Sequence, residues 1–453
     1  MSQLLFHALL FIALSTTCSL VMAEDGPVSF HREVLPIFRT NCIPCHKPGK
    51  AKGGLDLTTH AALLKGGDEG LAVKAGDTPG SRLIAAICGE EPEMPKDSEP
   101  LTPQEIAIVS RWIAQGALAD EPVDTLKQRP AEPPTYQALP SVHALSFSPD
   151  GTLLAVVGRH EILLHKADGS SIVARMTGDS PRLESIAFSR DGSLLVASGG
   201  AVSEFGEIQI WDTATRQLQR SIKASNDAFY GVAISPDNRQ VAVGCADKLV
   251  RVFNVADGIE VMRCDNHLDW VFGSAFTNDG LRLATVSRDK AAKLIDIVTG
   301  HLIDDINQTR DPLTCLTRHP LDDLIATGGT EGKIRLFRMQ PRGGRLAEGD
   351  NKEESFVREF EHMGSPIQAI AFSPDGSAIA CGALNGQLRL FKTDNGQRLV
   401  QIKDSHGPIF ALSFNAGGKQ IAAGGYDGCI RLYDAASGEV VNKFDSVPIT
   451  RKL

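Results

Sequence analysis

The sequence lacks an excess of positive charge. Of its 453 residues, 46 are Lys or Arg and 55 are Asp or Glu, so the formal net charge is −9. A chain of this sign is a poor ligand for a phosphate backbone, and we set nucleic acid aside as a partner. Long apolar runs are also absent after the first 23 residues, so we expect no integral membrane span in the mature chain.

A disulfide framework is lacking as well. The nine cysteines show no close, regular spacing. An oxidising compartment would allow disulfides, but no pairing can be read from the spacing. Outside residues 1–23 and one short motif, the cysteines are Cys88, Cys245, Cys264, Cys315, Cys381 and Cys429. We interpret Cys245 and Cys381, which stand at matching places in two repeats, as small buried hydrophobes.

The first 23 residues have the pattern of a signal peptide. Residues 4–14 are apolar apart from one histidine, and Val21-Met22-Ala23 places small residues at the cleavage positions, so we expect a cut after Ala23. No Lys or Arg precedes the apolar run, which departs from the usual pattern. A lipid anchor on Cys18 and an uncleaved anchor are the alternatives. The expected location of the mature chain is periplasmic or secreted.

The short motif is a cysteine pair followed by a histidine, Cys42-Ile43-Pro44-Cys45-His46. Two thiols at this spacing reach the two vinyl groups of one haem, and His46 then becomes the proximal ligand of its iron. The rival chemistries are zinc binding and thiol redox. Zinc would need a second Cys/His pair and a thioredoxin-like site a βαβ pattern, and we find neither in the sequence. We therefore predict one covalently attached haem c.

Six-coordinate iron needs a second axial ligand, and Met94 is our first choice. It stands in an irregular segment between two expected helices and is the only Met of residues 24–120. A methionine can instead fill a core. His31 and His60 are the alternative ligands, and a His/His pair would lower the reduction potential relative to Met/His.

The segment after Met94 predicts a well-specified helix. Thr102-Pro103-Gln104-Glu105 is a capping box with proline in the first turn, and Gly116 is the expected stop. Trp112 is expected to pack either in the core or near the haem. The apolar face of this helix consists of Ile106, Val109 and Ile113.

These motifs together resemble the planctomycete-type cytochrome c domain over about residues 30–118. The resemblance implies haem c on Cys42 and Cys45, with His46 and Met94 as axial ligands. Pro95-Lys96 departs from the Pro-Pro that often follows the family's methionine. The other matching segments are Val34-Leu35-Pro36-Ile37-Phe38, Gly53-Gly54-Leu55-Asp56-Leu57, Leu64-Lys65-Gly66-Gly67 and Pro79-Gly80-Ser81-Arg82-Leu83.

The remainder of the chain is repetitive. Residues 121–140 form a proline-rich linker. Seven related repeats then occupy residues 141–453, and most contain a Pro-Asp-Gly or similar turn between two short apolar strands. Equivalent phenylalanines are 41 residues apart at Phe147 and Phe188, and 42 apart at Phe372 and Phe414. This period is typical of a propeller blade of four strands. Residues 341–354 form an insertion that we expect to be a surface loop.

The repeats resemble WD40 repeats, which implies an all-β, seven-bladed β-propeller. One repeat ends in the full Trp-Asp pair of the family, Trp211-Asp212, whereas most other repeats depart from it. Asp289 and Asp427 stand where the family's aspartate bonds a histidine. The residues at that histidine position are His267, His362 and His406. How the ring closes is left open.

The expected architecture is a small all-α cytochrome c domain over residues 24–120, followed by the seven-bladed WD40 propeller. A haem with two protein ligands has no open position for substrate, which favours an electron carrier over a catalyst. The propeller would then bind a redox protein partner. The alternatives are an enzyme with its active site on the propeller, and a haem-bearing binding scaffold or redox sensor.

Overall fold

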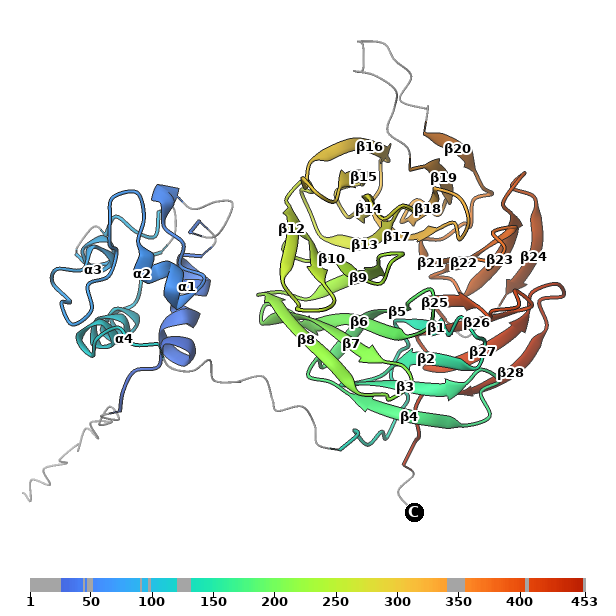
Figure 1. Ribbon diagram of the computed structural model, residues 1–453, viewed down its shortest axis with the longest axis horizontal. Coiled ribbons are helices and arrows are strands. Elements are labelled where there is room, and N and C mark those ends of the chain that lie inside the picture. The colour runs from blue at the N-terminus through green and yellow to red at the C-terminus, as the bar shows by residue number, and fades with distance from the viewer. Residues whose placement is uncertain are drawn as a thin grey trace, which may run out of the picture. The chain divides into compact units, whose positions relative to one another are not determined.

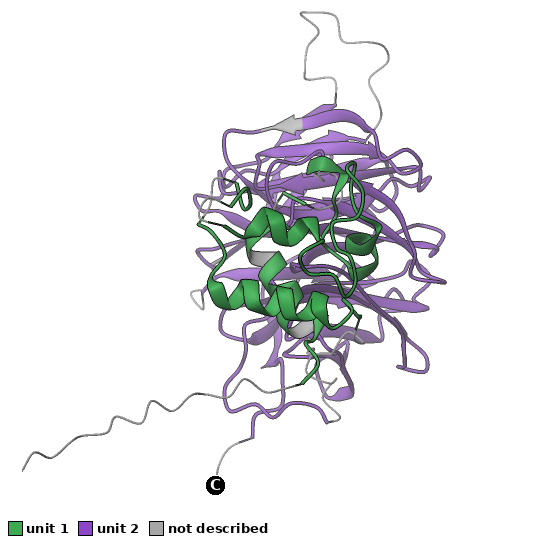
Figure 2. Ribbon diagram, turned by 90° about the vertical axis from the view of Figure 1, so that its left-hand side faces the viewer, with its two compact units in different colours: residues 1–125 green, residues 126–453 purple. Residues whose placement is uncertain are grey.

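A computed structural model describes residues 26–43, 45–46, 52–89, 92–96, 99–119, 132–339, 355–403 and 407–450. The chain divides into two compact units, residues 1–125 and 126–453 (Figures 1 and 2). The expected signal peptide, residues 121–131 of the expected linker, the insertion at 341–354 and His406 all lie outside the described residues. Within the described part, no helix has the length and apolarity that spanning a membrane requires.

The N-terminal unit is built from short helices around one hydrophobic core. Its largest fully buried side chains include Phe30, Phe38 and Trp112. The helices are a π-helical turn η1 (Phe30–Val34), α1 (Leu35–Asn41), a 3-10 turn η2 (Lys52–Gly54), α2 (His60–Lys65), α3 (Arg82–Ile87) and α4 (Pro103–Ala114).

The expected helix after Met94 is confirmed as α4. The side chain of Thr102 accepts from the Glu105 N–H, and the Glu105 carboxylate accepts from the Thr102 N–H at 2.8 Å, which completes the capping box. Val109 and Ile113 are fully buried, and Gly116 follows the last turn with φ +98°. The helix therefore begins and ends where its cap residues predict.

The C-terminal unit is a seven-bladed β-propeller, as the repeats predicted. Each blade is an antiparallel sheet of four consecutive strands (Figure 1). The first four blades are β1 (Leu145–Phe147), β2 (Leu153–Val157), β3 (Glu161–Lys166) and β4 (Ile172–Thr177); β5 (Arg182–Phe188), β6 (Leu194–Ala201), β7 (Phe205–Asp212) and β8 (Leu218–Ser225); β9 (Phe229–Ile234), β10 (Gln240–Cys245), β11 (Val250–Asn254) and β12 (Glu260–Cys264); and β13 (Val271–Phe276), β14 (Arg282–Ser287), β15 (Ala291–Asp296) and β16 (Leu302–Gln308).

The last three blades repeat the pattern. They are β17 (Leu313–Arg318), β18 (Leu324–Gly329), β19 (Arg335–Arg338) and β20 (Phe356–Glu359); β21 (Ile367–Phe372), β22 (Ala378–Ala383), β23 (Gln387–Lys392) and β24 (Arg398–Lys403); and β25 (Ile409–Phe414), β26 (Gln420–Gly425), β27 (Cys429–Asp434) and β28 (Val440–Asp445). The first strand of each blade contacts the first strands of the two neighbouring blades, and β25 contacts β1, so the ring is closed.

The turn after each innermost strand is held by its own side chains. In blade 2, the Ser189 hydroxyl donates to the Asp191 carboxylate at 2.7 Å, and the Ser193 N–H donates to the same oxygen at 3.0 Å. These hydrogen bonds lower the pKa of Asp191. Gly192 takes φ +72°, a value that favours glycine. This chemistry recurs around the ring and explains the Pro-Asp-Gly signal in the sequence.

The ring closes without sharing a strand between its first and last blades. Tyr136 pairs with Ile449 in a parallel bridge, and the Thr450 N–H donates to the Tyr136 carbonyl at 2.9 Å. The Val142 N–H donates to the Gly425 carbonyl at 2.9 Å. Residues 132–140, which the sequence assigned to the linker, are therefore attached to the seam between blades 1 and 7.

A buried ion pair anchors this seam. Glu161 is fully buried, and its two carboxylate oxygens accept from Arg175 at 2.7 and 2.8 Å. The Tyr136 hydroxyl donates to the same carboxylate at 2.6 Å, and Arg175 also donates to the Pro134 carbonyl at 2.6 Å. Burial, and secondarily the hydrogen bond to Glu161 and its charge, raises the pKa of the Tyr136 hydroxyl. The carboxylate thus holds the incoming chain to blade 1.

Tyr136→Phe should destabilise the propeller by about 1–3 kcal/mol, because the buried Glu161 loses one donor. Chemical denaturation followed by far-UV circular dichroism measures this change. Tyr426→Phe is the matched control, since Tyr426 is 67% exposed and its removal should change the unfolding free energy by less than about 0.5 kcal/mol. Equal unfolding free energies for the two variants would contradict a role of Tyr136 in the seam.

Candidate functional site

The cysteine–histidine motif forms one turn that continues α1. The Cys42 carbonyl accepts from the Cys45 N–H at 3.1 Å and from the His46 N–H at 3.0 Å. Residues three and four apart on such a turn share a face. The backbone therefore puts Cys42, Cys45 and His46 on one side of the chain.

Two further contacts fix this turn. The Leu57 N–H donates to the His46 carbonyl at 3.0 Å, so the chain after the turn folds back on it. At the end of α1, the Asn41 side-chain amide donates to the Ile37 carbonyl at 3.1 Å and to Glu105 at 3.4 Å. Helix α4, through its first turn, thereby holds the end of α1 from which the motif starts.

Both cysteines of the motif are free thiols in this structure. Cys42 is buried and belongs to the core of the unit, whereas Cys45 is half-buried. Burial, and secondarily the charge of Glu105, raises the pKa of Cys42 to about 11. The Cys42 sulfur is therefore neutral near pH 7 when nothing is bound to it, unlike the activated thiolate of a nucleophilic cysteine.

His46 carries a buried ring nitrogen without a partner. Its Nδ1 atom is enclosed by protein, and no described atom forms a hydrogen bond with it. A buried polar atom of this kind costs free energy unless a ligand or a neighbour satisfies it. Within the described residues, the Nδ1 atom of His46 is therefore left for a ligand or a hydrogen-bond donor to satisfy.

Met94 lies against the same core. Its side chain packs on the cluster that contains Cys42 and Ile43, and its N–H donates to the Ala86 carbonyl of α3 at 2.9 Å. The structure thus places the predicted axial methionine and the cysteine motif on one hydrophobic cluster of one unit.

His60, an alternative ligand, has a structural role. Its Nε2 atom forms a hydrogen bond of 2.7 Å with the Ala117 carbonyl. Its ring lies edge-on to Phe30 at 5.1 Å and to Trp112 at 6.0 Å. These contacts tie His60 to the end of α4. The side chain of His31, the other alternative, lies outside the described residues.

Trp112 packs in the core of the unit. Its ring is 5.3 Å from Phe30, and its indole N–H donates to the Leu118 carbonyl at 3.0 Å. Its polar atom is therefore satisfied within the protein, as a buried tryptophan requires.

Among the described residues, no three His, Cys, Asp or Glu side chains gather where they could hold a metal ion together.

In the propeller, the predicted histidine–aspartate pair forms in blade 4. His267 Nδ1 lies 2.8 Å from an Asp289 oxygen, and its Nε2 lies 2.8 Å from the Thr285 hydroxyl. Burial opposes ionisation, but the bonds from His267 and Leu268 lower the pKa of Asp289 to about 2. The pair is buried and joins the blade to the loop before it.

The other two predicted positions behave differently. Asp427 bonds Arg431 at 2.6 Å rather than a described histidine. His362 accepts the Gly364 N–H at 2.8 Å, and its carbonyl accepts from Arg389 at 2.8 Å. In blades 6 and 7, an arginine of the third strand, Arg389 or Arg431, therefore takes part in the hydrogen bonds at these positions.

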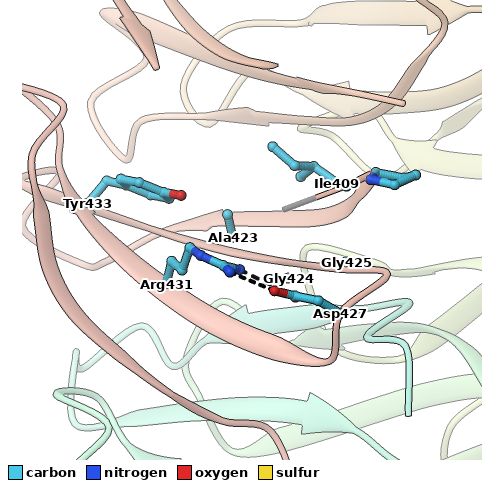
Figure 3. A pocket seen from close by; sticks show the side chains of 9 residues that line it. Ile409, Ala423, Gly424, Gly425, Asp427, Arg431 and Tyr433 are labelled. Atoms are coloured by element: carbon cyan, nitrogen blue, oxygen red, sulfur yellow. Dashed lines mark hydrogen bonds and ion pairs between the residues drawn. The ribbon is translucent and has the colours of Figure 1, made fainter. Parts of the chain in front are cut away.

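The Asp427–Arg431 pair lines a small pocket in blade 7 (Figure 3). Its volume is about 20 Å³, which is room for a single water molecule. A wider groove of about 510 Å³ runs between blades 6 and 7, and no His or Cys lines it. The charged residues that line the wider groove are Asp375, Lys419 and Asp434.

Comparison with known families identifies both units. The family described as Planctomycete cytochrome C matches residues 42–98, a range that contains all four predicted haem residues. The family described as Nucleolar protein 10-like, N-terminal domain, a β-propeller, matches residues 183–450, which is more than half of the chain.

Individual relatives are distant. They include a U3 small nucleolar RNA-associated protein 15 homolog of Xenopus tropicalis, 24% identical over 46% of this chain and 38% of its own length. A guanine nucleotide-binding protein subunit beta of Oryza sativa subsp. indica is 25% identical over 49% of this chain and 59% of its own length. Eukaryotic translation initiation factor 3 subunit I of Mycosarcoma maydis is 28% identical over 47% of this chain and 67% of its own length.

The chain thus spans less than two thirds of the first two of these relatives. All three alignments exceed 200 residues, longer than the whole N-terminal unit, so each extends into the propeller. The chain carries a planctomycete cytochrome c domain, and through its propeller it belongs to the family of the nucleolar protein 10-like N-terminal domain.

Proposed function

We propose that this protein is an exported c-type haem protein that transfers single electrons, and that its propeller binds a redox protein partner. The observation that carries the proposal is the turn that places Cys42, Cys45 and His46 on one face within a cytochrome c domain. A haem bound there supplies a reversible one-electron couple between ferric and ferrous iron.

Each protein group has a defined role in this proposal. Cys42 and Cys45 would hold the porphyrin through thioether bonds, which would make the cofactor a permanent part of the unit. His46 and Met94 are the residues that would ligate its iron. The buried, unpartnered Nδ1 of His46 supports a ligand at this residue, and the shared hydrophobic cluster supports Met94.

The surroundings suit electron transfer more than catalysis. With both His46 and Met94 as ligands, the iron would have no open position for a substrate. The apolar cluster around Cys42 and Met94 would keep water from one side of a bound haem. Such surroundings disfavour the more highly charged ferric form and so raise the reduction potential.

Export follows from the same chemistry. Covalent attachment of this type takes place outside the cytoplasm, and residues 1–23 have the pattern of a cleavable signal peptide. We therefore propose a periplasmic or secreted protein whose mature chain begins after Ala23.

The propeller is the proposed partner-binding unit. WD-repeat propellers present a broad rigid surface, and the match to a propeller family supports a protein-binding role here. The partner would be a redox protein that gives electrons to the haem or takes them from it.

Cys42→Ala combined with Cys45→Ala should abolish covalent haem attachment when the full chain is exported in a host that matures c-type cytochromes. Haem-stained denaturing gels and intact mass measure this loss. Cys88→Ala is the matched control, because Cys88 is a half-buried cysteine of the same unit outside the motif. Covalent haem on the double variant, or none on the wild-type chain, would contradict the assignment.

Met94→Ala should remove the far-red charge-transfer band of methionine-ligated ferric haem and open the iron to carbon monoxide in the reduced state. Absorption spectra of the purified variant test this. His60→Gln should keep the band, since His60 is engaged with Ala117. A five-coordinate, carbon monoxide-binding haem in the wild-type protein would sink the electron-carrier proposal and favour sensing or catalysis.

A further inference from the structure

Three residues that depart from the repeat meet at one mouth of the propeller channel. Six of the seven innermost strands end on an apolar residue, but β17 ends on Arg318. The position two residues after each strand end also varies between the blades. Four blades have a proline there and one has an alanine, whereas blade 2 has Arg190 and blade 4 has Asn278. The apolar strand ends are Phe147, Phe188, Ile234, Phe276, Phe372 and Phe414.

The three departing side chains contact one another. Arg190 donates to the Asn278 side-chain oxygen at 2.5 Å, and Arg318 donates to the same oxygen. The Asn278 amide nitrogen donates to the Leu321 carbonyl at 3.1 Å, which fixes the orientation of the amide. Arg190 therefore extends from blade 2 past blade 3, to the turn of blade 4 beside Arg318 of blade 5.

Two positive charges are thus brought together around a neutral acceptor. Within the described residues, each guanidinium makes this one hydrogen bond, and neither forms an ion pair with a carboxylate. The Asp323 carboxylate accepts the Asn278 N–H at 2.7 Å. Burial, and secondarily the charge of Arg190, lowers the pKa of Arg318 to about 10, while Asp323 acts in the opposite direction.

We infer that Arg190 and Arg318 form a binding site for an oxyanion at the turn-side mouth of the channel, with Asn278 setting the spacing of the two guanidinium groups. Each guanidinium has five N–H donors in a planar fork, so most of the donors here are unused by the protein. An oxyanion with two or more acceptor oxygens satisfies both forks and offsets the repulsion between them.

The chemistry of the ligand is common to two sources, a phosphate group and a carboxylate. The aspartates of the same turns, Asp191 and Asp279, are engaged by hydrogen bonds within those turns, so neither pairs with the two arginines. Two guanidinium groups without a carboxylate partner in the described part of the chain are complementary to either anion. Arg190 is exposed and Arg318 half-buried, which leaves the site open on the Arg190 side. The site belongs to the propeller alone and does not depend on the haem.

The test is calorimetric titration of the full-length protein with inorganic phosphate and, separately, with acetate. Sodium chloride holds the ionic strength constant, because screening alone changes exposed charges. We expect one saturable site for at least one of the two anions, with a dissociation constant of about 1 mM or tighter. The tighter of the two anions identifies the source.

Arg190→Ala should weaken that affinity about tenfold or more, through loss of a charge-assisted contact. Arg318→Phe restores the residue of the repeat; it should abolish binding and raise the melting temperature in the absence of the anion. Arg239→Ala is the matched control, an exposed arginine of the neighbouring turn that lies 3.9 Å from its own Asp237, and it should bind as the wild type does. No binding of either anion, or unchanged affinity in Arg190→Ala, would overturn the inference.

Discussion

The propeller depends on a seam that has no shared strand. Each blade uses four consecutive strands, so the first and last blades meet only through side chains and a few backbone contacts. A ring of seven blades is stable only if this joint is as firm as the other six. The fully buried Glu161 contributes to this joint, because it ties Arg175 and Tyr136 together on blade 1, and Tyr136 in turn bridges to Ile449, which follows the last blade. Removing one partner of such a group leaves an uncompensated charge in the interior.

The same segment joins the propeller to the N-terminal unit along the chain. Because Tyr136 is fixed, the chain between the two units ends there, several residues earlier than proline content alone suggests. In the N-terminal unit, the corresponding constraint is local. The Cys42 carbonyl holds both the Cys45 and His46 N–H groups, so a single turn arranges the proposed haem-binding side chains before any long-range contact is made.

Features carried by periodicity were predictable from the sequence. The 41- and 42-residue spacing of phenylalanines predicted the blades because it repeats along the chain. Thr102 and Glu105 predicted the start of α4 because a capping box acts over a few residues. The seam was not predictable in this way. Tyr136 and Ile449 are far apart along the chain, and nothing about Glu161 in the sequence marks it as buried. His60 illustrates the same limit, since only the fold shows that Ala117 occupies its nitrogen.

Arg318 lies between these two cases. The sequence contains its signal, a charged residue at a position where the other blades have Phe or Ile, but its meaning appears only when Arg190 and Asn278 are seen beside it. A single departure from a repeat is tolerated wherever the surface permits it. Three departures from three blades that contact one another need a common cause, because each alone places a polar group at a position that the repeat fills with an apolar or proline side chain. Departures from local rules of this kind are expected at functional sites, which is why we propose that the cluster binds an anion.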